Sequence, residues 1–158
     1  MADWTLAPAD AGMLDDLAGI EAACFAHPWS RELLESELAR EDAVILCALA
    51  AGRPVAYGSM RVVLDEGSIG NLACLPDYRH RGAGGMVLDG LLAAGAEQGA
   101  RSILLEVRPS NTAAVRLYQS RGFSEVGRRK HFYRDPLEDA ILMMRCLTGP
   151  IPPEGPEG

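Results

Sequence analysis

One stretch of the chain, from Ser68 to Gly99, limits the possible folds more than any other. Its pattern predicts a strand at 68–74, then a basic, glycine-rich loop at 76–85, then a helix that ends at Gly99. The helix is predicted because apolar residues recur at helical spacing after the loop. A strand that leads through such a loop into an amphipathic helix is typical of sheets covered by helices.

The segments on either side extend this pattern along the chain. Ser30 is a suitable N-cap for one further helix, and Gly122 is a suitable end for another. We therefore expect an α/β fold in which helices flank one mixed β-sheet. The predicted helices besides the one after the loop lie at 11–25, 30–40 and 111–121, and the predicted strands at 4–6, 43–50, 55–64, 68–74 and 102–108, with two more around a turn at Asp135-Pro136.

Length and composition limit the class of protein. We expect residues 1–147 to form a single domain and residues 148–158, rich in Pro, Gly and Glu, to be a disordered tail. The net charge of -7 argues against a protein that coats nucleic acid through bulk charge. Because the chain has neither a long apolar run nor a signal-peptide pattern, we expect a cytoplasmic protein without a membrane partner. The four cysteines lack metal-ligand spacing, so we expect no metal.

The glycine-rich loop has the features of an anion site. A helix N-terminus exposes unpaired N–H groups, and Gly82, Gly84 and Gly85 let an anion approach them closely. The basic residues at 79–81 add local positive charge in an acidic protein. The loop is neither a Walker motif nor a G-x-G-x-x-G fingerprint. It predicts a pyrophosphate site, and an ordinary turn with solvated arginines is the alternative.

Three segments together resemble one superfamily. Arg79-x-x-Gly82-x-Gly84 followed by an amphipathic helix is similar to the acetyl-CoA motif of the GNAT superfamily of N-acetyltransferases. The stretches at 105–111 and 114–118, followed by Gly122-Phe123, resemble the closing half of that fold.

A narrower resemblance rests on other segments. Phe25-Ala26-His27-Pro28-Trp29-Ser30, Asn71-Leu72-Ala73, and Tyr133 with residues 138–140 are similar to the branch of the superfamily that acetylates the N-terminal alanine of a ribosomal protein. The resemblance covers about residues 3–146, which is nearly the whole expected domain.

The resemblance implies a GNAT-type central sheet, mostly antiparallel, and acetyl-CoA as the co-substrate. The implied reaction is direct attack on acetyl-CoA, in a ternary complex, by the N-terminal alanine amine of a small-subunit ribosomal protein. Glu106 is the implied general base and Tyr118 the implied general acid. The implied cofactor-binding residues are Leu72, Ala73, Cys74, Arg79, His80, Arg81, Gly82, Ala83, Gly84, Gly85 and Asn111.

Two positions depart from the family pattern. Gly85 stands where relatives often carry a larger, frequently basic residue, which removes one possible phosphate contact from the loop. Cys74-Leu75 stands where relatives usually have an aliphatic residue followed by Asp. A covalent role for the Cys74 thiol is disfavoured, because no adjacent histidine would activate it.

Each catalytic candidate also has a purely structural interpretation. Glu106 is predicted on the strand face that carries Leu104 and Arg108, where it could pair with Arg108 or another basic residue. Tyr118 could be a core tyrosine, and Asn111 could cap its helix while it also contacts the cofactor.

The remaining candidates concern the acceptor. Trp29, His131 and Tyr133 are candidates for lining the amine-binding cleft, although Trp29 suits the core equally well, and His27 is interpreted as a turn residue. The basic run at 128–130 either helps to hold the cofactor's phosphate or forms a solvated face.

Two alternative functions stay open. A GNAT enzyme that acetylates another protein N-terminus, a lysine or a small amine would share the same catalytic core. A non-catalytic acyl-CoA-binding module would bind without turnover, and the presence of both Glu106 and Tyr118 disfavours it.

Overall fold

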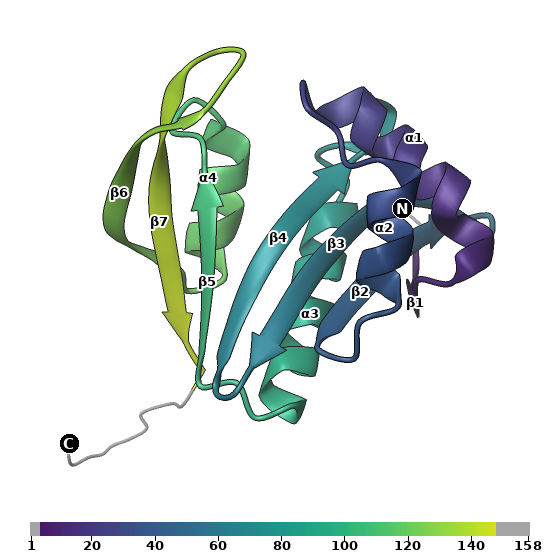
Figure 1. The fold of residues 1–158 in the computed structure, drawn as a ribbon, viewed down its shortest axis with the longest axis horizontal. Helices are drawn as coiled ribbons and strands as arrows, with labels where there is room; N and C mark the ends of the chain where they lie inside the picture. The colour runs from purple at the N-terminus through teal and green to yellow at the C-terminus, as the bar shows by residue number, and fades with distance from the viewer. Residues whose placement is uncertain (1–3, 148–158) are drawn as a thin grey trace.

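The computed structural model describes residues 4–147 and shows one seven-stranded sheet flanked by helices (Figure 1). The strand order is β1-β2-β3-β4-β5-β7-β6. The strands are β1 (Thr5–Pro8), β2 (Ala43–Ala50), β3 (Arg53–Val63), β4 (Glu66–Cys74), β5 (Ser102–Val107), β6 (Ser124–Tyr133) and β7 (Glu138–Cys146). The helices are α1 (Leu14–Cys24), α2 (Arg31–Leu38), α3 (Ala83–Glu97) and α4 (Thr112–Ser120), with short 3₁₀ turns at Ala11–Met13 and Pro76–Tyr78.

The predicted order of strands and helices is confirmed. The predicted cap at the start of α2 is present, since the Ser30 hydroxyl accepts a hydrogen bond from the Leu33 N–H at 3.1 Å. The bounds differ by two or three residues: α1 begins at Leu14, after a 3₁₀ turn, and β3 begins at Arg53, because Arg53 pairs with Ala50 across a tight turn. The predicted disordered tail at 148–158 lies outside the described residues.

The sheet is antiparallel except between β4 and β5. These two strands pair in parallel over only three residue pairs, from Glu66↔Ser102 to Ser68↔Leu104. Beyond that point β4 stays paired with β3, and β5 stays paired with β7. The two halves of the sheet therefore diverge toward the carboxyl ends of β4 and β5 (Figure 1).

Helices cover both faces of the β1–β4 half. On one face α3 contributes Val87, Leu88 and Leu91 to the larger core cluster. On the other face α1 and α2 form a second cluster, which closes around the buried Tyr57 ring of β3. In the other half of the molecule, α4 lies beside β5 and β7 (Figure 1). None of the helices within residues 4–147 is both long and apolar enough to cross a membrane.

A glycine on β3 sets how closely α3 approaches the sheet. A Cβ added at Gly58 would lie 2.9 Å from side-chain carbons of Val87 and Leu91 on α3, and equally close to Leu72 on β4. A side chain at this position would force these packed groups to shift, because a close-packed core has little spare volume. With α3 packed closely on the sheet, its N-terminus lies beside the carboxyl end of β4.

Candidate active site

Two connected hollows lie where β4 and β5 diverge. The hairpin pocket, of about 740 Å³, is bounded by the 25–29 segment, by β4 and β5, and by the β6–β7 hairpin. The loop pocket, of about 560 Å³, lies between the 72–74 segment of β4, the N-terminus of α3 and one face of α4. The two pockets share six lining residues, namely Cys24, Phe25, Leu72, Asn111, Ala114 and Tyr118.

The predicted anion cradle, which consists of Gly82, Gly84 and the N-terminus of α3, lies at one side of the loop pocket. Gly82 precedes α3 with a φ of 96°, in the left-handed region that favours glycine, and caps the helix without a side-chain hydrogen bond. The first N–H groups of α3 are therefore available to a ligand. Gly84 faces open space, since an added Cβ would meet only a Leu117 carbon, at 3.9 Å.

Most of the predicted cofactor-binding residues line this pocket, and two do not. Ala83 is buried in the core, at 1% exposure. The Arg81 guanidinium lies over the Tyr78 ring, 5.6 Å from its centroid, and the Arg81 carbonyl accepts a hydrogen bond from the Trp4 indole. The lining residues from the predicted set are Leu72, Ala73, Cys74, Arg79, His80, Gly82, Gly84, Gly85 and Asn111.

Arg79 lines the loop pocket but is engaged elsewhere. Its Nε donates to the Cys74 carbonyl at 3.1 Å, and its Nη2 lies 3.5 Å from the Cys24 sulfur. The guanidinium therefore ties the loop back to the carboxyl end of β4. Burial raises the pKa of the Cys74 thiol, and the Arg79 charge offsets this only in part.

The basic run at 128–130 lines neither pocket. Arg128 pairs with Glu125 at 2.9 Å, and Arg129 pairs with Glu106. None of the three side chains is among those lining the loop pocket. Of the two interpretations of this run, the solvated face agrees with the structure.

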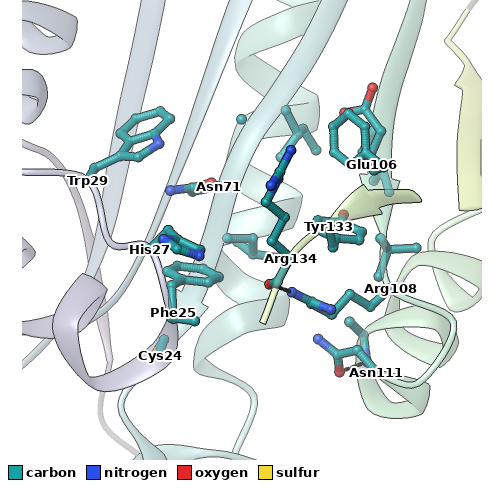
Figure 2. A pocket seen from close by; sticks show the side chains of 18 of the residues that line it. Cys24, Phe25, His27, Trp29, Asn71, Glu106, Arg108, Asn111, Tyr133 and Arg134 are labelled. Atoms are coloured by element: carbon teal, nitrogen blue, oxygen red, sulfur yellow. Dashed lines mark hydrogen bonds between the residues drawn. The ribbon is translucent and has the colours of Figure 1, made fainter. Parts of the chain in front are cut away.

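Glu106 lies on the β5 face that lines the hairpin pocket, whereas Leu105 and Val107 point into the core. Its Oε2 atom is 3.4 Å from Nε of Arg129 on β6. Arg108, the other partner considered from the sequence, instead contacts Glu138 at 3.2 Å and lies over the Tyr133 ring, 4.5 Å from its centroid. Glu106 thus has a half-buried, loosely paired carboxylate at the pocket (Figure 2).

Tyr118 lies in the lining that the two pockets share. Its ring packs edge-to-face on Phe123, with centroids 5.7 Å apart. Burial raises the pKa of its phenol well above the usual value, so the group stays protonated at neutral pH. Among the hydrogen bonds of residues 4–147, none involves the Tyr118 hydroxyl. A protonated, buried donor without a protein acceptor is suited to give its proton to a ligand.

Asn111 performs the capping role expected of it. Its Oδ1 accepts a hydrogen bond from the Ala114 N–H at 3.2 Å, at the start of α4. The residue also lines both pockets. Capping and ligand contact are therefore compatible in this geometry.

The predicted acceptor-side residues separate into two groups. Trp29 and Tyr133 line the hairpin pocket from opposite sides (Figure 2). Burial and the neighbouring Glu106 raise the pKa of Tyr133 to about 12. His131 lines neither pocket, and its backbone N–H donates to Asp139 at 2.9 Å. His131 is therefore removed from the set of candidates for the cleft.

Two contacts around the hairpin pocket were not predicted. Nε2 of His27 lies 2.5 Å from Oδ2 of Asp135, so the turn after α1 touches the tip of the β6–β7 hairpin at the pocket rim. Beneath that rim, the fully buried Glu21 carboxylate accepts hydrogen bonds from the Trp29 N–H at 2.7 Å, from Asn71 Nδ2 at 2.6 Å, and from the Tyr57 hydroxyl. Glu21 lies four residues after Leu17 on the buried face of α1, and this spacing is the signal in the sequence that could have revealed it.

Within residues 4–147 no three His, Cys, Asp or Glu side chains gather in a way that could hold a metal ion. The groups that can act on a ligand here are a carboxylate, a phenol and the N–H groups of a helix N-terminus. Such a set can remove a proton, supply a proton and hold an anion.

Comparison with known proteins agrees with this geometry. A family model described as the acetyltransferase (GNAT) family matches residues 14–123. The chain is 37% identical over 126 residues to the [ribosomal protein bS18]-alanine N-acetyltransferase of Escherichia coli strain K12, an alignment that covers 78% of this chain and 84% of that protein.

Solved structures share the fold. The crystal structure of the ribosomal-protein-S18-alanine N-acetyltransferase from Escherichia coli superposes with a TM-score of 0.84 at 33% identity, over 92% of this chain and 94% of that one. Arabidopsis thaliana NAA60 in complex with acetyl-CoA superposes with a TM-score of 0.84 at 19% identity, over 93% of this chain and 100% of that one, which concerns the fold alone.

Proposed function

The chain belongs to the GNAT family of acetyltransferases, and we propose that it moves the acetyl group of acetyl-CoA onto the N-terminal alanine amine of ribosomal protein bS18. One observation carries the proposal. The hairpin pocket and the loop pocket meet at a lining that holds Tyr118, and Glu106 faces the hairpin pocket beside that junction. An amine from one side and a thioester from the other would meet between a base and an acid.

The loop pocket suits the donor. Its anion cradle at the N-terminus of α3 would hold the pyrophosphate of acetyl-CoA. From there the pantetheine arm would run along the edge of β4 at Leu72, Ala73 and Cys74. Within the described residues this edge has no strand partner on the β5 side beyond Ser68, so its backbone groups can bond the amides of the arm.

Glu106 and Tyr118 divide the proton transfers. A peptide α-amine has a pKa of about 8 and is mostly protonated at neutral pH, so it must lose a proton before it can attack. The Glu106 carboxylate would take that proton, directly or through a water. The amine nitrogen then bonds the thioester carbon, the carbon–sulfur bond breaks, and the thiolate takes the proton of the Tyr118 phenol. The nitrogen gives up its second proton, which returns through water to the Tyr118 phenolate, and Glu106 releases the first proton to solvent. The products are an acetylated N-terminus and coenzyme A.

The hairpin pocket suits the acceptor. A peptide N-terminus would enter between Trp29 and Tyr133, beside the contact of His27 with Asp135. An acceptor on the small ribosomal subunit would place the reaction in the cytoplasm, in agreement with the expectation from the sequence.

The proposal is tested by mass spectrometry with acetyl-CoA and a synthetic peptide of the first residues of bS18, beginning with alanine. We expect one added acetyl group on the α-amine. The control is the same peptide with a blocked α-amine, which retains any lysines and should stay unmodified. If a small amine or a lysine were acetylated while the free alanine peptide was not, the acceptor would be misassigned. Acetyl-CoA binding without turnover on any amine would indicate a binding module instead.

A further inference from the structure

The loop pocket needs a cation that the glycine-rich loop does not supply. Its basic lining residues are Arg79, His80 and Arg121. The Arg79 guanidinium bonds the Cys74 carbonyl and contacts the Cys24 sulfur, so it faces the end of β4 rather than the helix. The chain as a whole is acidic, with a net charge of -7, and would repel a polyanionic ligand. The remaining arginine in the pocket comes from another element.

Arg121 follows the last residue of α4 and is held in one orientation. Its Nε donates to Oδ1 of Asp89 at 3.0 Å, and its Nη2 to Oδ2 of Asp89 at 3.3 Å. Its Nη1 also donates to the Ser120 hydroxyl at 3.2 Å. Because a guanidinium has five N–H groups in a rigid fork, these three bonds fix its plane and leave further donors free.

The fork lies over the first turn of α3. A Cβ built on Gly85 would be 2.6 Å from Nη2 of Arg121 and 3.3 Å from its Cζ. The 2.6 Å contact is shorter than real Cβ atoms show, so the guanidinium occupies the place that a side chain at position 85 would fill. Arg121 can therefore take this position only because residue 85 is a glycine.

We propose that Arg121, positioned by Asp89 and given room by Gly85, is the guanidinium that bonds the pyrophosphate of bound acetyl-CoA. The proposal rests on the proposed function, since it takes acetyl-CoA as the ligand of the loop pocket. The N–H groups at the start of α3 and the guanidinium of Arg121, which follows α4, would both donate hydrogen bonds to the same pyrophosphate. Arginine forks suit phosphate oxygens because they donate two parallel hydrogen bonds.

The test is calorimetric binding of coenzyme A and of 3′-dephospho-coenzyme A, which keeps the pyrophosphate, in the absence of any acceptor. Arg121→Gln is expected to weaken both ligands about tenfold, the scale of one charge-assisted hydrogen bond. Arg121→Lys, which keeps the charge but not the fork, should show a smaller loss. The matched control is Arg116→Gln, which changes an exposed arginine on α4 outside the pocket and should bind as wild type.

Three results would overturn the proposal. Unchanged affinity in both Arg121 variants would show that Arg121 does not bond the pyrophosphate. A loss for coenzyme A alone would assign Arg121 to the 3′-phosphate instead. An equal fall in kcat/KM with S-acetylpantetheine, which has no phosphate, would show a general disturbance. If wild type did not bind coenzyme A at all, the proposed function would fail first, so the two failures are distinguishable.

Asp89 is tested as a positioning residue. Asp89→Asn keeps the shape of the side chain but weakens its hold on the fork of Arg121. We expect a higher KM for acetyl-CoA with unchanged kcat and unchanged KM for the acceptor peptide. A fall in kcat without a change in the acetyl-CoA KM would contradict the positioning role.

Discussion

The carboxylate of Glu106, which lines the hairpin pocket, and the guanidinium of Arg129 on β6 lie 3.4 Å apart. This ion pair is the structural alternative to a catalytic role for Glu106. The Arg129 side chain is 56% exposed and the contact is long, and such surface pairs contribute about 0–1 kcal/mol to stability. The pair alone therefore gives little reason for a carboxylate at this point of the pocket.

Glu106→Gln separates the two roles. Loss of a general base is expected to lower kcat about 100-fold or more, since proton transfer by a positioned group contributes on this scale. Coenzyme A binding should stay nearly unchanged, because Glu106 does not line the loop pocket. Steady-state kinetics with the alanine peptide, together with calorimetry, measure both quantities.

Arg129→Gln is the matched control for this variant. It breaks the same ion pair but leaves the carboxylate in the pocket, so activity should stay within about threefold of wild type. Wild-type activity in Glu106→Gln would remove Glu106 from the mechanism. An equal loss in both variants would show that the pair acts as a structural unit.

Tyr118→Phe removes one oxygen and keeps the edge-to-face packing on Phe123. The expected fall in kcat is on the order of 100-fold, because the thiolate loses its proton donor. The melting temperature should change little, since no hydrogen bond of the described residues involves this hydroxyl. A variant with full activity would leave Tyr118 as a core residue only.

The same variant makes a prediction in alkaline solution. Burial raises the folded pKa of Tyr118 above the unfolded value of about 10. A raised folded pKa gives stability that is complete below about pH 10 and is lost as the pH rises further. Tyr57 and Tyr133 also have raised pKa values, and both residues remain in the variant. The contribution of Tyr118 is therefore the difference between wild type and Tyr118→Phe at each pH. Chemical denaturation should show a smaller loss of unfolding free energy above pH 10 in Tyr118→Phe than in wild type.

Local patterns predicted the fold well, because each element carries its own signal. The apolar period marks α1 and α3, Ser30 and Gly122 mark helix ends, and the strands alternate with turns. The opposite orientations of Leu105 and Glu106 on β5 also follow from strand alternation alone. These features depend on residues that are close together in the sequence, so they can be predicted from one sequence alone.

The contacts that complete the site depend on distant segments, and the sequence did not reveal them. Arg79 was expected to hold a phosphate, but it bonds Cys74, and Arg121 from the end of α4 occupies the space over Gly85. Arg129 on β6 rather than Arg108 pairs with Glu106, and β6 has an irregular register on β7 next to this position. Strand register and helix approach are set by packing across the whole domain.

Glu37 predicts how the protein responds to acid. The Arg61 guanidinium bonds its buried carboxylate at 2.7 and 2.8 Å and holds the pKa of Glu37 below its usual value. A lowered folded pKa gives stability that is present above about pH 4.3 and is lost as the pH falls below it. Glu37→Gln should lower the unfolding free energy at pH 7 by about 1–3 kcal/mol, and the difference from wild type should shrink toward pH 3. A difference that stays constant with pH would contradict the assignment.

Gly84→Trp tests the anion cradle itself. The position lines the loop pocket, and a Cβ added there meets only a Leu117 carbon at 3.9 Å, so an indole is expected to project into the pocket. We expect the Kd for coenzyme A to rise more than 100-fold, the loss expected when several phosphate contacts are blocked together. Gly19→Trp is the control, because a Cβ added on that exposed face of α1 meets nothing within 4 Å. Normal affinity in Gly84→Trp would mean that the phosphates bind elsewhere.

Glu21→Ala addresses the acceptor side through a buried group. It leaves the Trp29 N–H, the Asn71 amide and the Tyr57 hydroxyl without their shared acceptor, which should cost about 2–4 kcal/mol of unfolding free energy. Trp29 and Asn71 line the hairpin pocket but not the loop pocket. The KM for the alanine peptide should therefore rise several-fold while the Kd for coenzyme A stays the same.

The control is Glu35→Ala, which removes an exposed carboxylate from α2 and should alter neither stability nor KM. Urea unfolding and initial rates at varied peptide concentration give the two readouts. Tyr57→Phe removes only one of the three donors, and so provides a milder variant that keeps the other two bonds to Glu21. A peptide KM that stays at the wild-type value in both variants, despite the lost stability, would show that Glu21 supports the core without shaping the acceptor pocket.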